Sequence, residues 1–146
     1  MGLVLLVQLA ATLFMVGVIW FVQVVHYPLF GSVGHEGFAA YSRAHARLTG
    51  LVVGPPMLLE AATAMVLLLR PPQGVPFLLP LLGAALLAVV WLSTALLQSP
   101  QHAVLGRGFS PVSHRFLVAS NWLRTVCWTA RGLVVLLMLY AILPPL

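Results

Sequence analysis

The stretch from Gln23 to Arg47 carries most of the side chains in this sequence that could do chemistry. It contains three of the five histidines and two of the three tyrosines, namely His26, His35, His45, Tyr27 and Tyr41. Imidazole is a common ligand for zinc, copper, iron and nickel, and imidazole and phenol groups can both transfer protons. Because long apolar runs lie on either side of this stretch, we expect any chemistry to take place here, between two membrane spans.

The elements that must position these side chains are membrane helices. The chain has 146 residues, of which 62% are hydrophobic and only 6% charged, whereas soluble domains have about 25% charged residues. A helix needs about 20 apolar residues to cross the bilayer core, and the sequence supplies four such stretches, at about residues 3–25, 38–69, 76–98 and 112–143. This pattern predicts an all-α fold, a single membrane domain over residues 1–146 in which four antiparallel helices run alternately up and down.

Prolines mark the ends of these helices and one irregularity within them. The residue before a proline avoids the helical region, so we expect the first span to end at Tyr27-Pro28 and the third at Ser99-Pro100. The second span contains Gly54-Pro55-Pro56, which predicts a kink. Ser113 is a candidate cap for the fourth span.

Alternating helix directions place one histidine from each span at the same side of the membrane. These are His26, His45, His102 and His114. Because metal sites in helical bundles are built from side chains on facing helices, the four histidines are candidate ligands for haem or a first-row transition metal. The alternative is that each imidazole lies among the lipid headgroups and binds water and helix ends.

Two charged residues lie at matching depth inside the second and fourth spans. Glu60 follows His45 in the second span, and Arg131 follows His114 in the fourth, by similar lengths of chain. At a helical rise of about 1.5 Å per residue, both lie roughly 22–26 Å from the histidine side. Since a buried charge is costly alone and tolerable in a pair, we expect a structural ion pair between Glu60 and Arg131.

Arg124 lies near the middle of the fourth span, and no acidic residue is left to pair with it. Glu36, the second of the two acidic residues, is in the loop after the first span. Arg124 is therefore a candidate receptor for a haem propionate, a lipid carboxylate, a phosphate headgroup or a quinone carbonyl. The alternative is that it binds backbone carbonyls freed at the predicted kink. Further candidates for this ligand site, on inward-facing stripes of the four spans, are Asn121, Gln98, Gln23, Trp91 and Trp128.

The distribution of arginine predicts the orientation in the membrane. The net charge of +5 comes from seven arginines against two glutamates, and these arginines are too scattered to form a nucleic-acid-binding face. Arg70 stands alone at one side, whereas four arginines lie at the histidine side, namely Arg43, Arg47, Arg107 and Arg115. The positive-inside rule then places the histidine side in the cytoplasm and both termini outside, in the inner membrane of a cell. The single cysteine, Cys127, excludes an internal disulfide.

Three segments carry a resemblance to other sequences. The segments QVVHYPLF, FAAYSRAHARLTGLVVGPPMLLE and WLSTALLQSPQHAVLGRGF…NWLRTVCWTARG resemble a bacterial family of small integral membrane proteins with four spans and no assigned function. The resemblance covers most of the chain and implies a four-helix membrane bundle. It implies no activity.

Three functions are compatible with this pattern. The first is a membrane oxidoreductase or cofactor-binding protein that acts on a lipophilic small molecule such as a quinone, with Tyr27 and Tyr41 passing protons or electrons. The second is a non-catalytic subunit or assembly factor of a larger membrane complex, or a homo-oligomer. The third is a small carrier or channel with Glu60 in its path.

Overall fold

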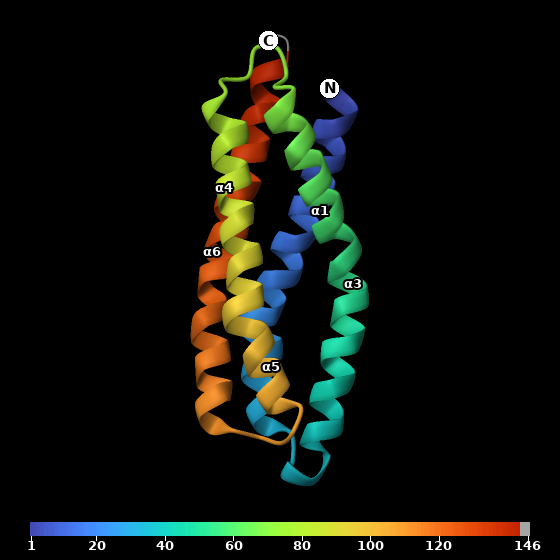
Figure 1. The fold of residues 1–146 in the computed structure, drawn as a ribbon, viewed down its shortest axis with the longest axis vertical. Coiled ribbons are helices and arrows are strands. Elements are labelled where there is room, and N and C mark those ends of the chain that lie inside the picture. The colour runs from blue at the N-terminus through green and yellow to red at the C-terminus, as the bar shows by residue number, and fades with distance from the viewer. Residues whose placement is uncertain (144–146) are drawn as a thin grey trace.

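The structure, a computed structural model that describes residues 1–143, is a bundle of four long helical segments that run alternately up and down (Figure 1). The segments in chain order are α1 (Gly2–Phe21) with η1 (Val22–His26), α2 (Tyr27–Leu29) and η2 (Phe30–Ser32); α3 (His35–Leu69); α4 (Leu78–Ser93) with η3 (Thr94–Gln98) and α5 (Ser99–Leu105); and α6 (Pro111–Ile142). All four are long and apolar enough to cross a membrane. The predicted all-α bundle with four spans is therefore confirmed.

The first and third spans continue past the prolines at which we expected them to end. Helical structure extends to Ser32 in the first span and to Leu105 in the third. In each case a π-helical turn precedes the proline. The backbone N–H of Tyr27 binds the carbonyl of Val22, and that of Ser99 binds the carbonyl of Thr94 in the same way. The wider turn accommodates the proline ring, so the predicted ends were wrong.

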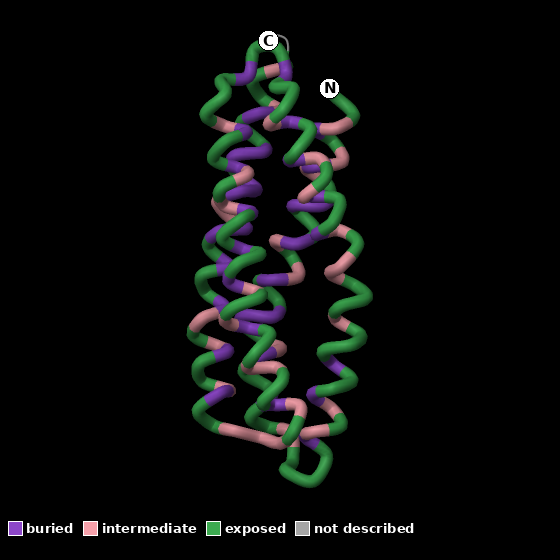
Figure 2. Tube along the Cα trace, in the orientation of Figure 1, coloured by how far each residue is buried: buried purple, intermediate pink, exposed green. Residues whose placement is uncertain are grey.

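Helix α3 remains helical through Pro55 and Pro56, and its axis changes direction about half-way along its length (Figure 1). Every residue between His45 and Met57 is exposed or half-buried, and Figure 2 shows this part of α3 standing apart from the buried faces of the other helices. The bend brings the following residues, from Met57 onward, back against the bundle.

The other three segments pack closely. Helix α6 lies against both α1 and α4, and its buried face includes Leu117, Trp128 and Val135. The outer surface carries large apolar side chains, such as Leu58 and Leu133, as expected for helices that face lipid. The N-terminus of α6 is capped by Ser110, which accepts a hydrogen bond from the backbone N–H of Ser113. We had predicted Ser113 as the cap, and this prediction was wrong because the capping residue is Ser110.

Candidate functional site at the histidine end of the bundle

The two π-helical turns position part of the site. Turn η1 ends at His26 and turn η3 ends at Gln98. Each turn is followed closely by a proline, Pro28 and Pro100 respectively. An extra residue in a helical turn rotates everything that follows it, and such turns are frequent at functional sites. Here they turn Tyr27 and His102 toward each other, with the phenol oxygen 2.9 Å from His102 Nε2.

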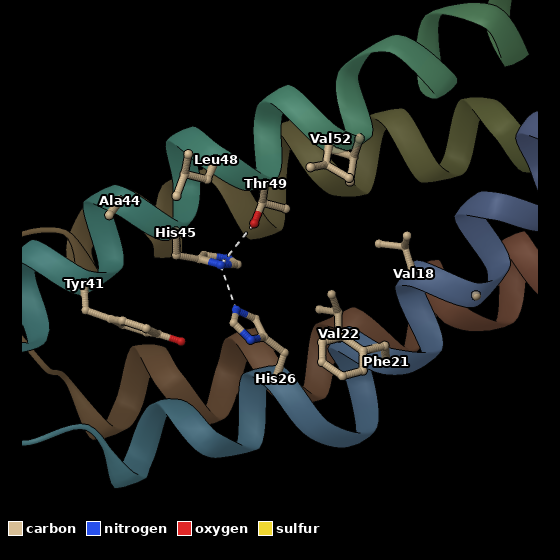
Figure 3. Close-up of a pocket in the computed structure, with 12 residues that line it drawn as sticks. Val18, Phe21, Val22, His26, Tyr41, Ala44, His45, Leu48, Thr49 and Val52 are labelled. Atoms are coloured by element: carbon tan, nitrogen blue, oxygen red, sulfur yellow. Dashed lines mark hydrogen bonds between the residues drawn. The ribbon is translucent and has the colours of Figure 1, made fainter.

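His26 and His45 form a pair of imidazoles between α1 and α3. Nε2 of His26 lies 2.7 Å from Nδ1 of His45, and the hydroxyl of Thr49 lies 3.1 Å from the same Nδ1 (Figure 3). The Tyr41 ring extends toward this pair (Figure 3), with its centroid 6.4 Å from that of His26. One nitrogen of the pair must donate and the other accept, so one proton lies between the two rings, and the tautomers decide which ring carries it.

Tyr27 joins His102 to Arg124. The Arg124 guanidinium donates to the Tyr27 hydroxyl over 3.2 Å, and that hydroxyl also binds His102. The second ring nitrogen of His102, Nδ1, is buried and has no hydrogen-bond partner within residues 1–143. Because an unsatisfied buried polar atom is costly, this nitrogen indicates a place for water or a ligand.

Arg124 is held by side chains rather than by the backbone. Its Nε donates to Asn121 Oδ1 over 2.9 Å, and its Nη2 donates to the same oxygen. A longer contact of 3.4 Å reaches the Thr94 hydroxyl. Asn121 is itself fixed by Gln23, whose Oε1 accepts from it over 2.8 Å. Of the two predicted environments for Arg124, binding to freed backbone carbonyls is not observed among residues 1–143.

Arg124 is buried without an anionic partner. It is only 8% exposed, and within residues 1–143 the one ion pair joins Glu60 to Arg131 instead. The groups that Arg124 does contact are neutral, an amide and two hydroxyls. A buried guanidinium is expensive unless it binds an anion or a strong acceptor, so this arrangement leaves it available for a ligand.

Two pockets of about 650 Å³ each lie beside His45, where α3 stands apart from the bundle. The arginine pocket, between α3, α5 and α6, is lined by three arginines, two histidines and Tyr27; these are Arg43, Arg107, Arg124, His45 and His102. The apolar pocket, between α1 and α3, is lined by His26, Tyr41 and mostly aliphatic residues such as Val22 and Leu48 (Figure 3). His45, Thr49 and Val53 line both pockets. His45 thus stands between them.

The four histidines do not assemble as the predicted metal site. No group of three or more histidine, cysteine or acidic side chains in residues 1–143 has an arrangement that could hold a metal ion. His114 lies apart from the others, because its Nε2 binds the carbonyl of Tyr27 at 2.7 Å and its ring packs against Phe109 and Phe30. Equal depth brought these histidines to one end of the bundle, but rotation about the helix axes keeps His114 away.

Three further predicted site residues lie outside both pockets. Gln98 is buried between Ser93 and Ser120, to which it is hydrogen-bonded. Trp91 is 40% exposed and lines a shallow apolar groove between α3 and α4. Trp128 is fully buried in the core. Asn121 and Gln23 do not line either pocket. Of the six predicted ligand-binding residues, Arg124 alone lines one of the two pockets, and Asn121 and Gln23 orient it through hydrogen bonds.

A second polar network occupies the other half of the bundle. Arg131 Nε lies 3.0 Å from Glu60 Oε1, so the expected ion pair is present. Glu60 also accepts hydrogen bonds from Thr12 at 2.7 Å and from Trp128 Nε1 at 3.0 Å. Arg131 in addition donates to the backbone carbonyl of Gly83. These bonds tie α1, α3, α4 and α6 together.

Sequence reasoning missed several residues of the arginine pocket. Thr49, Thr94 and Ser99 contribute hydroxyl groups to its wall. Arg43 and Arg107 line it too, although their positions had been used only to predict orientation. The sequence signal that could have located the site is the pair of prolines near the ends of the first and third spans, Pro28 and Pro100, since each follows a π turn in the structure. No protein-family model, no curated protein and no solved structure matches this chain.

Proposed function

We propose that this protein binds a lipophilic small molecule within the membrane and holds its head group in the arginine pocket. The head group is a hydrogen-bond acceptor, such as a carbonyl, carboxylate or phosphate. The observation that carries the proposal is Arg124, a buried guanidinium that faces a pocket of about 650 Å³ and has no carboxylate partner in residues 1–143. A ligand acceptor would supply the charge-assisted hydrogen bonds that Arg124 lacks.

The shape of the site supports a ligand that enters from the bilayer. The pocket forms where α3 stands apart from the bundle, and its wall includes Ala46, Gly50 and Ala103, all of which are exposed. In a membrane these residues face lipid, so a hydrophobic chain can extend between α3 and α5 while the head group reaches Arg124. The volume of the pocket is also in the range that is typical of small-molecule sites.

The side chains around the pocket support proton transfer as the chemistry of the site. His102 and Tyr27 are hydrogen-bonded to each other, and His45 is connected to His26 and Thr49. Histidine and tyrosine are common general acids and bases. A head group bound to Arg124 would lie beside these groups and could gain or lose a proton, as the reduction of a quinone or an acid–base reaction requires.

A haem or transition-metal centre is less well supported by the geometry. The two histidine nitrogens closest to each other are only 2.7 Å apart. Two nitrogens that each bind one zinc ion at about 2.0–2.1 Å in tetrahedral geometry would lie roughly 3.3 Å apart. The His26–His45 contact has instead the length of a hydrogen bond, which favours proton sharing.

The proposal is tested by binding a fluorescent alkyl amphiphile with an anionic head group to the purified protein in lipid nanodiscs. We expect Arg124→Gln to weaken binding about tenfold or more, since hydrogen bonds to charged groups contribute about 1.5–3 kcal/mol. Arg115→Gln is the matched control, because Arg115 is an exposed arginine on the same helix and outside the pocket. Equal affinities for the two variants would contradict the proposal.

A further inference from the structure

The charge of the arginine pocket narrows the chemical class of the ligand. This inference rests on the proposed function. Arg43, Arg107 and Arg124 all line the pocket, and its lining contains no acidic residue. The chain has two acidic residues in total, and Glu60 is occupied by Arg131. Three full positive charges around one cavity favour an anion over a neutral carbonyl.

The three arginines lie at different depths in the pocket. Arg124 is buried at the inner wall, whereas Arg43 and Arg107 are exposed at its outer edge. Arg43 Nη1 donates to the carbonyl of Gly106 over 2.7 Å, which fixes the start of α3 beside the end of α5. Because Arg43 also lines the pocket, we infer that its remaining guanidinium donors are available to a ligand. An anion with several oxygens can therefore bind arginines on both sides.

Hydroxyl groups also line the site proposed for phosphate. Thr49, Thr94 and Ser99 line the same pocket. Guanidinium groups bind phosphate through paired, charge-assisted hydrogen bonds. The Thr94 hydroxyl already donates to the carbonyl of Val90 over 2.8 Å, and the Thr49 hydroxyl contacts His45 Nδ1, so within residues 1–143 Ser99 is the hydroxyl that can donate to the phosphate. A carboxylate has two oxygens to offer, whereas a terminal phosphate has three, so phosphate uses more of these donors.

The source of the phosphate is a lipid rather than the free ion. The outer wall at Ala46, Gly50 and Ala103 is apolar and exposed, and these residues belong to two helical segments that are long and apolar enough to cross a membrane. Free phosphate would gain nothing from this wall, whereas hydrocarbon chains attached to the phosphate would cover it. We propose that the arginine pocket binds a phosphorylated lipid, with its phosphate between Arg43, Arg107 and Arg124 and its chains leaving between α3 and α5.

The test compares three amphiphiles with the same alkyl chain and fluorophore and with a phosphate, a carboxylate or an uncharged ketone head group. Binding to the full chain is measured in nanodiscs of zwitterionic lipid. We expect the phosphate amphiphile to bind roughly tenfold tighter than the ketone, because a phosphate carries its own negative charge and forms paired hydrogen bonds with guanidinium groups, whereas a ketone is neutral and offers one oxygen. In the double variant Arg43→Gln/Arg107→Gln this preference should become smaller, because Arg124 is then the one arginine left in the pocket lining.

The matched control is Arg47→Gln/Arg115→Gln, which removes two exposed arginines from the same end of the bundle but outside the pocket. The control should keep the preference for phosphate.

An equal loss of the preference for phosphate in both double variants would overturn the inference, since the preference would then come from general attraction to basic helix ends. If the ketone binds as tightly as the phosphate, the inference fails while the proposed function stands; if none of the amphiphiles binds, both fail. If inorganic phosphate displaced the phosphate amphiphile at an equal concentration, the inference that the bound phosphate belongs to a lipid would be wrong.

Discussion

At the residue scale, the Tyr27 hydroxyl is the connection between the acid–base groups and the cation of the site. It lies 2.9 Å from His102 Nε2 and 3.2 Å from Arg124 Nη2. Tyr27 owes this position to the π turn that precedes it. His102 also carries the buried and unsatisfied Nδ1. These three residues therefore define where the head group of a ligand should sit.

Replacement of Tyr27 by phenylalanine tests this connection. Tyr27→Phe removes the hydroxyl that binds Arg124 and His102, so we expect the affinity for an anionic amphiphile to fall about three- to tenfold, since a typical hydrogen bond contributes about 0.5–1.5 kcal/mol. The fold should persist, because hydrogen bonds between membrane helices contribute about 0.6 kcal/mol on average. Tyr41→Phe is the control, since Tyr41 lines the apolar pocket instead. Affinities that fall equally in both variants would argue against the role of Tyr27.

Removal of metal ions provides a second test at this scale. Because the histidines share hydrogen bonds with each other, with Tyr27 and with the backbone, we expect chelator treatment to leave both thermal stability and amphiphile affinity unchanged. Thermal unfolding and binding are measured before and after dialysis against the chelator. A loss of either property that zinc or iron restores would show that the histidines act as metal ligands.

Part of the site could be predicted from individual residues. The regular rise of the α-helix was enough to place Glu60 beside Arg131, and the shortage of acidic residues identified Arg124 as a cation without a partner. Depth alone could not predict which histidines meet. That depends on rotation about each helix axis, and the π turns alter this rotation just before Tyr27 and Ser99.

At the element scale, the bend of α3 makes room for the site. Helix α3 contacts the bundle at His45 and again from Met57 onward, and the stretch between these residues is exposed or half-buried. Both pockets open along this stretch. The prolines of the sequence predicted the bend, but its consequence depends on which side of α3 faces the bundle, and the sequence pattern did not indicate that.

Removal of the two prolines should change both the bend and the site. Alanine restores the backbone donors that proline lacks, so Pro55→Ala/Pro56→Ala should straighten α3, narrow the pockets and weaken amphiphile binding. The distance between spin labels at Val24 and Arg47, measured by pulsed electron resonance in a variant without Cys127, should become shorter. Pro111→Ala is the control, since Pro111 begins α6. An unchanged distance would show that packing, not the prolines, sets the bend.

At the scale of the whole molecule, the Glu60 network holds the helices together opposite the open pockets. Glu60 and Arg131 are 0% and 1% exposed, and their hydrogen bonds involve all four spans. The fold class and the number of spans followed from composition and the lengths of the apolar runs. Composition and run lengths could not predict that one half of the bundle is closely packed and the other half contains open pockets, because this difference results from side-chain packing.

Loss of the Glu60 carboxylate should destabilise the fold. Glu60→Gln leaves Arg131 buried without a counter-ion, and we expect the free energy of unfolding to fall by roughly 3–5 kcal/mol. Glu36→Gln should have almost no effect, because Glu36 is exposed. Unfolding is measured in detergent by denaturant titration. Equal stability of the two variants would mean that the ion pair does not stabilise the bundle.

The orientation in the membrane is a further prediction at this scale. The excess of arginine at the histidine end predicts that this end faces the cytoplasm. In cells that express variants without Cys127, a membrane-impermeant maleimide should label a cysteine at Gln73 and leave one at Gly34 unlabelled. The two residues lie in loops at opposite ends of the bundle. If the cysteine of Gly34→Cys were labelled and the one at Gln73 were not, the histidine end would face the outside and the predicted orientation would be wrong.

The most direct test of the proposed binding site is to map where a lipophilic ligand binds. A phosphate amphiphile with a photoreactive group next to its head is cross-linked to the purified protein in nanodiscs, and the modified residues are identified by mass spectrometry. We predict that cross-links concentrate on the walls of the arginine pocket, in residues 43–53 and 94–107, and that Arg124→Gln removes them. Cross-links spread evenly over lipid-facing positions such as Leu58 and Leu133, and unchanged in Arg124→Gln, would contradict the proposed site.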